Sequence, residues 1–214
     1  MIHGWTEQHP SAIGRLNSGL PYMADGRRVP RSVRIPYKWL RNEMRERLPE
    51  STGRTPIWMI AKPNFQRRRI CDWRCQTNVG NLCGGVHVTP GKTWMRVRLP
   101  ADRVLLSDFD RWENVIQGQY VPENEDDAYE WDDHVRRTFR LGAFEPIPDI
   151  ETGWPKSLLR NVIRSWSRVF DTANATTIQG SFERLVLWDV CALVDGPPST
   201  QGDSAAALAR RLAE

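Results

Sequence analysis

The chain has 214 residues, of which 40% are hydrophobic and 26% are charged, and these values are those of a folded globular protein. No apolar run approaches the roughly 18 residues that a membrane-spanning helix needs. The opening "MIHGWTEQHP" also lacks the basic and apolar segments of a secretory signal. We therefore expect no membrane partner and a cytoplasmic protein, whose four cysteines are reduced unless they bind metal.

The net charge of +4 is distributed unevenly along the chain. Residues 1–100 carry 18 Lys and Arg against 6 Asp and Glu, whereas residues 101–214 carry 12 against 20. Clustered arginines commonly contact the phosphates of nucleic acid or of a dinucleotide. Solvation, or attraction between the two halves, also accounts for such clusters. The candidate phosphate-binding residues are Arg27, Arg28, Arg31, Arg34, Arg67, Arg68 and Arg69.

Hydrophobic spacing predicts the elements of the first half in chain order. Residues 2–8 are predicted to form a short strand. Ile13, Leu16 and Leu20 follow at helical spacing, and Gly19 is placed to end this helix with a left-handed residue. A second helix is predicted over residues 36–48, after a loop rich in Gly, Pro and Arg. A buried strand follows at 55–61. Alternation of arginines with apolar residues predicts a half-buried strand at 92–100.

The segment "RVLLSDFDRW", residues 103–112, passes from an apolar run into Asp108 and Asp110. One interpretation is the start of a helix, capped by Ser107, where the helix dipole favours acidic side chains. The other is a site, with both carboxylates at the end of a strand and facing a cleft. The two interpretations are compatible, and the sequence leaves both open.

The second half predicts helices over 123–141, where Gly142 stops the helix, and over 155–171. A strand or short helix at 177–182 leads into a final buried strand at 185–194. Because strands and helices do not alternate regularly, we expect an α+β fold: a mixed or antiparallel central sheet flanked by several helices. Residues 1–196 are expected to form this single domain, and residues 197–214 a linker and a short C-terminal helix.

A metal-like cluster lies between the two halves of the predicted sheet. Cys71, Cys75, Cys83 and His87 fall within 17 residues, and three thiolates with an imidazole make a sound tetrahedral zinc set. Such a zinc would be structural, because four protein ligands leave no open position. The spacing has no C-x2-C knuckle, so a hairpin with reduced cysteines is the alternative.

Five segments together resemble one known family over roughly residues 4 to 195. They are "WTEQ", "TPIWMIAKPNF", "VRLPADRVLLSDFDRWENVI", "SWSRVFD" and "TIQGSFERLVLWDVCALV", and their order is kept. The family is an uncharacterised bacterial and phage domain of unknown function, number 3841. Its name implies no activity, and its pattern includes neither the Cys/His cluster nor the C-terminal tail.

A weaker resemblance concerns the start of the chain. The strand tip "GWTEQ", followed by a short helix and "LNSGL", is similar to the entry of ADP-ribosyltransferase-like folds. The resemblance implies that residues of the first strand bind NAD and that a late strand supplies Gln179 near the nicotinamide ribose. Glu183 would supply a carboxylate if its segment were helical. The chain departs from the family because no Arg or His stands at the strand tip, since His3 precedes it.

These resemblances and the aromatic residues define the candidate NAD site. Aromatic rings stack on nicotinamide, and acidic residues stabilise a developing positive charge on the ribose. Packing in the core is the alternative role for the tryptophans. The candidate cofactor-binding residues are Trp5, Thr6, Gln8, Trp58 and Trp166, and the candidate catalytic residues are Gln179, Glu183, Asp108 and Asp110.

Three functions follow as hypotheses. The first is an NAD-dependent ADP-ribosyltransferase-like enzyme, as a toxin or a phage- or defence-related effector. The second is a nucleic-acid-binding module without catalysis, which uses the basic N-terminal half. The third is a protein-interaction factor, such as a phage inhibitor of a host component, with its contact on the acidic helix 123–134 or the C-terminal tail.

Overall fold

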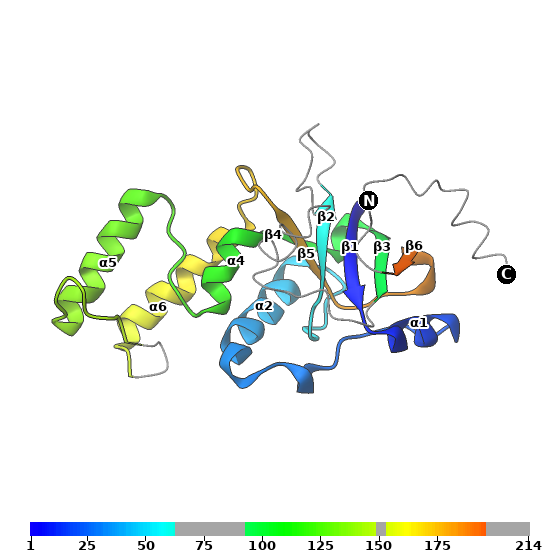
Figure 1. The fold of residues 1–214 in the computed structure, drawn as a ribbon, viewed down its shortest axis with the longest axis horizontal. Helices are drawn as coiled ribbons and strands as arrows, with labels where there is room; N and C mark the ends of the chain where they lie inside the picture. Colours follow the sequence, from blue (N-terminus) through cyan, green and yellow to red (C-terminus); the bar gives the residue numbers. More distant parts are fainter. Residues whose placement is uncertain (63–92, 149–152, 196–214) are drawn as a thin grey trace.

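The structure is a computed structural model that describes residues 1–62, 93–148 and 153–195. In these ranges it has one six-stranded antiparallel sheet and five α-helices, so the expected α+β class with an antiparallel sheet is confirmed (Figure 1). The Cys/His cluster, the arginines at 67–69 and the segment 197–214 lie outside the described residues.

The sheet has the strand order β4-β5-β2-β1-β3-β6. The first strand of the chain therefore lies in the interior of the sheet, and the late strand β5 is separated from it by one strand. This order brings residues that are far apart in the sequence onto one surface. The strands are β1 Ile2–Gln8, β2 Ile57–Lys62, β3 Thr93–Leu99, β4 Leu105–Asp108, β5 Ile178–Phe182 and β6 Val190–Asp195.

The helices follow the predicted periodicity, with differences at their ends. Gly19 has a φ of 76°, as expected for a residue that ends a helix. The predicted stop at Gly142 is wrong, because the left-handed residue is Arg140, with a φ of 57°, and Leu141 N donates to Arg136 O. The helices are α1 Pro10–Asn17, α2 Arg34–Arg47, α4 Phe109–Ile116, α5 Glu125–Phe139 and α6 Lys156–Ser165.

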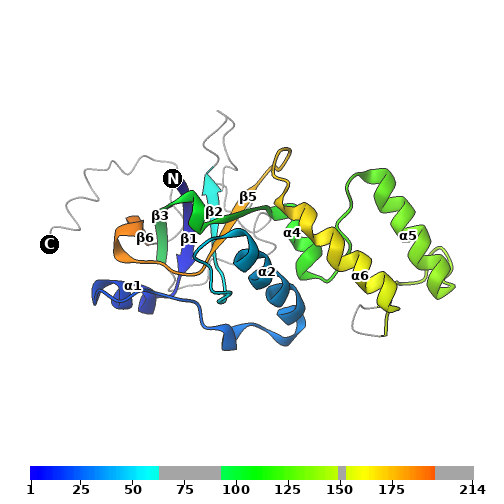
Figure 2. The ribbon, with the colours of Figure 1, turned by 180° about the vertical axis from the view of Figure 1, so that it is seen from behind.

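Each face of the sheet is packed against a different set of helices. On one face, Met59, Met95 and Val97 pack with Ala12 and Leu16 of α1. The other face is covered by α2, α4 and the 3-10 helix η4 (Trp166–Phe170), which share a second core cluster with β4. A fully buried aliphatic side chain contributes roughly 1.5–3 kcal/mol, so both layers stabilise the sheet. Figure 2 shows the same arrangement from behind.

The helices α5 and α6 extend away from the sheet (Figures 1 and 2). Aromatic rings join them: the ring centroid of Trp154 lies 5.5 Å from that of Phe139 and 6.4 Å from that of Trp131. Trp131 also stacks on Tyr120 at 4.3 Å. We call α5 and α6 with the loop 118–124 the helical lobe. None of the helices in the described ranges combines the length and hydropathy that crossing a bilayer requires.

The final segment differs from the predicted buried strand. Only β6 is extended, and it lies at the edge of the sheet, after the 3-10 helix η5 (Leu187–Asp189). Asp189 explains the turn, because its carboxylate receives two 3.0 Å hydrogen bonds from Arg103 and one from Val186 N. The turn leaves Trp188 79% exposed.

Candidate functional site

A row of cross-strand partners crosses the sheet. Trp5 pairs with Arg96 on β3 and with Ile60 on β2, Ile60 pairs with Gln179 on β5, and Gln179 pairs with Ser107 on β4. Side chains of directly paired residues point to the same face of a sheet. These five residues, which we call the central row, therefore share one face. The row joins two of the residues that the sequence had singled out, Trp5 and Gln179.

Two buried polar groups of the central row have no hydrogen-bond partner in the described part of the chain. They are Ser107 Oγ and Gln179 Nε2, in side chains that are 2% and 4% exposed. Leaving such a group unpaired costs on the order of 1–3 kcal/mol. Both groups can donate a hydrogen bond, so an acceptor such as a carbonyl, hydroxyl or phosphate oxygen would satisfy either of them.

Trp58 lies two residues from Ile60 and therefore on the same face. It is half-buried; its Nε1 donates to Tyr37 OH at 3.1 Å, and its ring lies 4.8 Å from that of Trp112. Burial raises the pKa of Tyr37, although its hydrogen bond with Trp58 opposes this. Trp166 is fully buried in the second core cluster and donates to Gln119 O at 2.7 Å, so its position is that of a core residue.

The alternation along β1 separates the other first-strand candidates from the central row. Thr6 is 1% exposed and donates to Trp58 O at 2.6 Å, and Gln8 Nε2 donates to Thr6 Oγ1. Both residues pair on the face opposite to Trp5. His3 and Glu7 instead lie on the face of Trp5. Neither residue is among the candidates predicted from the sequence, although the period of two within "IHGWTEQ" is a signal that could have found them.

Asp108 and Asp110 begin a helix, as the first of the two interpretations of the segment 103–112 predicts. Asp108 is the N-cap of α4, and its Oδ1 accepts from Asp110 N at 2.9 Å and from Arg111 N at 3.2 Å. The predicted cap at Ser107 is wrong, because Ser107 is still part of β4. Asp110 Oδ2 accepts from Thr176 Oγ1 at 2.7 Å.

Glu183 lies beyond the end of β5 and is held by the loop 51–54. Its carboxylate accepts hydrogen bonds from Ser51 Oγ (2.6 Å), Arg54 N (2.7 Å), Thr52 N (2.9 Å) and Thr52 Oγ1 (3.0 Å). Partial burial would raise the pKa of Glu183, but these hydrogen bonds outweigh it and lower that pKa. Because β5 is a strand and not a helix, Glu183 lies about 13 Å along the chain from Gln179.

A cavity of about 300 Å³ adjoins this carboxylate. Arg103 on its wall is already engaged, since it forms a bidentate ion pair with Asp189 and donates to Arg184 O at 2.8 Å. The cavity therefore presents charges of both signs. Its lining residues are Pro21, Met23, Leu48, Glu50, Ser51, Thr52, Arg54, Asp102, Arg103, Glu183 and Arg184.

The described candidate phosphate-binding arginines are all exposed, in the segment between α1 and the start of α2. Arg27 forms an ion pair with Asp25 at 3.0 Å, which lowers the pKa of Asp25 and raises that of Arg27. The acidic helix α5 is partly neutralised by its own residues, because Asp132 pairs with Arg136 and Asp133 with Arg137.

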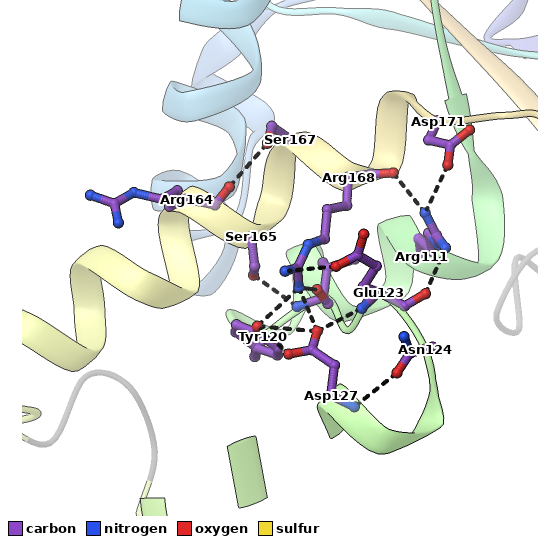
Figure 3. A network of polar contacts seen from close by, with 11 residues as sticks. Arg111, Tyr120, Glu123, Asn124, Asp127, Arg164, Ser165, Ser167, Arg168 and Asp171 are labelled. Carbon is purple, nitrogen blue, oxygen red and sulfur yellow. Dashed lines mark hydrogen bonds and ion pairs between the residues drawn. The ribbon is translucent and has the colours of Figure 1, made fainter. Parts of the chain in front are cut away.

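Arg168 joins the helical lobe to the rest of the molecule (Figure 3). Its Nη1 donates to Tyr120 OH at 2.9 Å, to Val121 O at 2.7 Å and to Asp127 Oδ2 at 2.7 Å. Burial of Asp127 would raise its pKa, but hydrogen bonds from Glu123 N, Tyr120 and Arg168 lower it. The arrangement is a fully paired network, which indicates a structural role.

The family of the chain is shown by comparison with known proteins. A model of the Domain of unknown function (DUF3841) matches residues 5–191, and the chain therefore belongs to this family. The first resemblance seen in the sequence is thus confirmed. No curated protein and no solved structure matches the chain.

Proposed function

We propose that the protein is an NAD-dependent ADP-ribosyltransferase-like enzyme whose site is the central row. A role as a toxin or a phage- or defence-related effector belongs to the same proposal and rests on the resemblance to that fold alone. The observation that carries the proposal is the register: Trp5 of the first strand and Gln179 of the late strand lie on one face, separated by Ile60.

The size and chemistry of the central row suit a nucleotide. Two strand spacings place Trp5 and Gln179 about 10 Å apart, a span that a nicotinamide ring and its ribose would bridge. The indole of Trp5 would stack on nicotinamide, and the Gln179 amide would bond the ribose hydroxyls. Arg96 is exposed at the end of the row, where its guanidinium would pair with the pyrophosphate.

The proposed reaction is group transfer at ribose. The bond between C1′ and the nicotinamide nitrogen breaks, its electron pair stays on that nitrogen, and nicotinamide leaves as a neutral molecule. The acceptor nucleophile then forms a new bond to the oxocarbenium-like C1′ and gives up its proton to the solvent. The protein accelerates this step by stabilising positive charge on the ribose with a carboxylate.

We assign the carboxylate to Glu7. It stands two residues from Trp5 on the same strand and face, and it is half-buried. Gln179 carries no charge, Glu183 lies beyond the end of β5, and Asp108 points to the opposite face of β4 from Ser107. Glu7 is thus the acidic residue that the register brings to the central row among the described strands.

Nicotinamide release tests this proposal. Purified protein is incubated with NAD, and free nicotinamide is measured by chromatography for the wild type, Gln179→Ala and Gln117→Ala. Gln117 is an exposed glutamine at the end of α4 and serves as the matched control. We expect release to fall at least about tenfold in Gln179→Ala, which corresponds to about 1.4 kcal/mol, and to be unchanged in Gln117→Ala.

Two further results test the role of Gln179 and the proposed reaction. Gln179→Glu keeps the size of the side chain and adds a carboxylate, so it should retain or increase release even if Gln179→Ala is poorly folded. Equal release from all variants, or none from the wild type, would contradict the proposal.

A further inference from the structure

The exposed side of α2 carries a line of cations. Arg34, Lys38, Arg41 and Arg45 are spaced by four, three and four residues, and all four are exposed. At 100° per residue they fall within a sector of about 60° of the helix surface. We call these four residues the basic stripe. They extend over about 16 Å of helix, because each residue adds 1.5 Å.

The basic stripe is not neutralised by its own helix. Within the described ranges, none of its four residues forms an ion pair. Around the helix axis, the acidic residues of α2 lie about 80° or more from the nearest residue of the stripe. Glu43 pairs with Arg47 at 2.8 Å, and Glu46 is exposed next to that pair.

The position of the stripe is set by the opposite side of α2. Leu40 and Met44 are buried against the sheet, at 1% and 0% exposed, and so the helix cannot rotate. At the C-terminal end of the stripe, Arg41 Nε donates to Gly53 O, and the Arg45 guanidinium lies against Gly53. The stripe therefore ends at the loop that holds Glu183, beside the cavity flanked by Arg54 and Arg184.

The geometry points to the phosphate backbone of a nucleic acid as the partner of this stripe, and we propose that it binds there. A nucleic acid strand carries a phosphate about every 3.4 Å of duplex axis, so the stripe spans about five phosphates. Three of its four cations are arginines, which hold phosphate oxygens with two parallel hydrogen bonds. A membrane surface fits less well, because the apolar side of α2 is buried in the core and cannot insert.

This inference goes beyond the proposed NAD site, which lies on the sheet. It adds a macromolecular partner, and the arrangement makes nucleic acid a candidate acceptor for the transferred group. The two proposals are separable, because the binding measurement below contains no NAD.

The test is fluorescence anisotropy of the full chain with labelled single-stranded DNA, RNA and duplex DNA of about 20 nucleotides, between about 50 and 200 mM salt. The test variant is Arg34→Gln/Lys38→Gln. The control is Arg160→Gln/Arg164→Gln, which removes two charges, also four residues apart, from the exposed side of α6. A thermal melt of each variant checks the fold, and Lys38→Glu replaces the test variant if the double change impairs folding.

We expect the wild type to bind at least one of the three probes with an affinity that falls as salt rises. The test variant should bind roughly tenfold more weakly, with a slope of log K against log salt smaller by about 1.4, or 0.7 for each lost phosphate contact to a single strand. The control variant should bind like the wild type, and the test variant should keep any stabilisation by NAD.

Three outcomes would overturn the inference. The first is the absence of binding to all probes, and the second is an equal loss in the test and control variants, which would indicate net charge alone. The third is that nucleic acid does not bind and that the stripe is instead needed for another interaction, namely self-association, binding of an acidic protein or binding of anionic vesicles.

Discussion

Glu183 illustrates why an acidic residue in a promising segment need not be catalytic. All of its bonding capacity is used by the loop 51–54, which accounts for its lowered pKa. The sequence "SFER" cannot reveal this, because the donors lie about 130 residues earlier in the chain. In contrast, the alternation of side chains between the two faces of β1 can be predicted from the sequence. It places Trp5 and Thr6 on opposite faces of the sheet.

Replacing Glu183 by Gln should destabilise the protein by about 2 kcal/mol at pH 7, since hydrogen bonds to a charged group are lost. A carboxyl whose pKa is lowered on folding contributes stability above its unfolded pKa, here the ordinary value of 4.5. That contribution disappears as the pH falls through the lower pKa of the folded state. Denaturant unfolding from pH 7 to pH 3 should therefore show the gap between wild type and variant closing below about pH 4.5.

The control for this prediction is Glu50→Gln, at an exposed position on the same cavity. Its stability should follow that of the wild type throughout. A gap between wild type and Glu183→Gln that stays constant down to pH 3 would show that the carboxylate charge is not what the loop recognises.

At the start of α4, substitutions of Asp108 distinguish a role in capping the helix from a role in catalysis. Asp108→Ala removes the oxygen that accepts from two backbone N–H groups and should cost about 1 kcal/mol. Asp108→Asn keeps an accepting oxygen, and so its melting temperature should be close to that of the wild type. Nicotinamide release should also survive in Asp108→Asn, and its loss in a stable Asp108→Asn protein would make this carboxylate catalytic.

Substitution of glycine by alanine should have opposite effects on stability in β1 and in α1. At Gly4 in β1, an added Cβ would lie 2.7 Å from Ile60 O, a backbone atom that cannot move aside. At Gly14 in α1, the same atom would meet nothing within 4 Å. Gly14→Ala should therefore stabilise the protein by roughly 0.5–1 kcal/mol, whereas Gly4→Ala should destabilise it. Thermal melts compare the two, and equal effects would mean that β1 is not packed against β2 as described.

The elements themselves were largely predictable, because hydrophobic period and caps are local. The strands at residues 2–8 and 55–61 and the helix at 36–48 appear within two residues of the expected positions. The errors arose where a distant residue decides the conformation. Arg103 and Asp189 hold a turn within the predicted last strand. The error at Gly142 has a different cause, because the left-handed conformation at Arg140 is one that its residue type does not favour.

At the scale of the whole molecule, the sheet order was not predictable. The central row combines residues 5, 60, 96, 107 and 179, and four pairings had to form to bring them together. No local signal specifies that β1 lies between β2 and β3. The charge difference between the two halves of the chain was visible in the sequence. The set of cations exposed on one side of α2 follows only from the way its buried residues pack against the sheet.

The attachment of the helical lobe depends on Arg168. Arg168→Ala removes three hydrogen bonds from one guanidinium nitrogen and leaves Asp127 without its cation, so we expect a loss of about 2–3 kcal/mol. Hydrogen exchange should increase in residues 118–128 and remain unchanged in β1 and β2. Arg168→Lys keeps the positive charge but loses the planar set of donors, so its stability should lie between that of the wild type and that of Arg168→Ala. Uniform exchange across the molecule would contradict a local role.

NAD binding at the central row is tested most directly by the thermal shift that NAD causes in the wild type, Trp5→Ala and Trp188→Ala. Trp188 is 79% exposed and belongs to η5, not to the central row, so Trp188→Ala controls for the loss of an indole. We expect saturating NAD, at about 100 times its Kd, to stabilise the wild type and Trp188→Ala by about 2.7 kcal/mol, and Trp5→Ala much less. No shift in the wild type, or the same shift in all three proteins, would contradict the claim that the central row binds NAD.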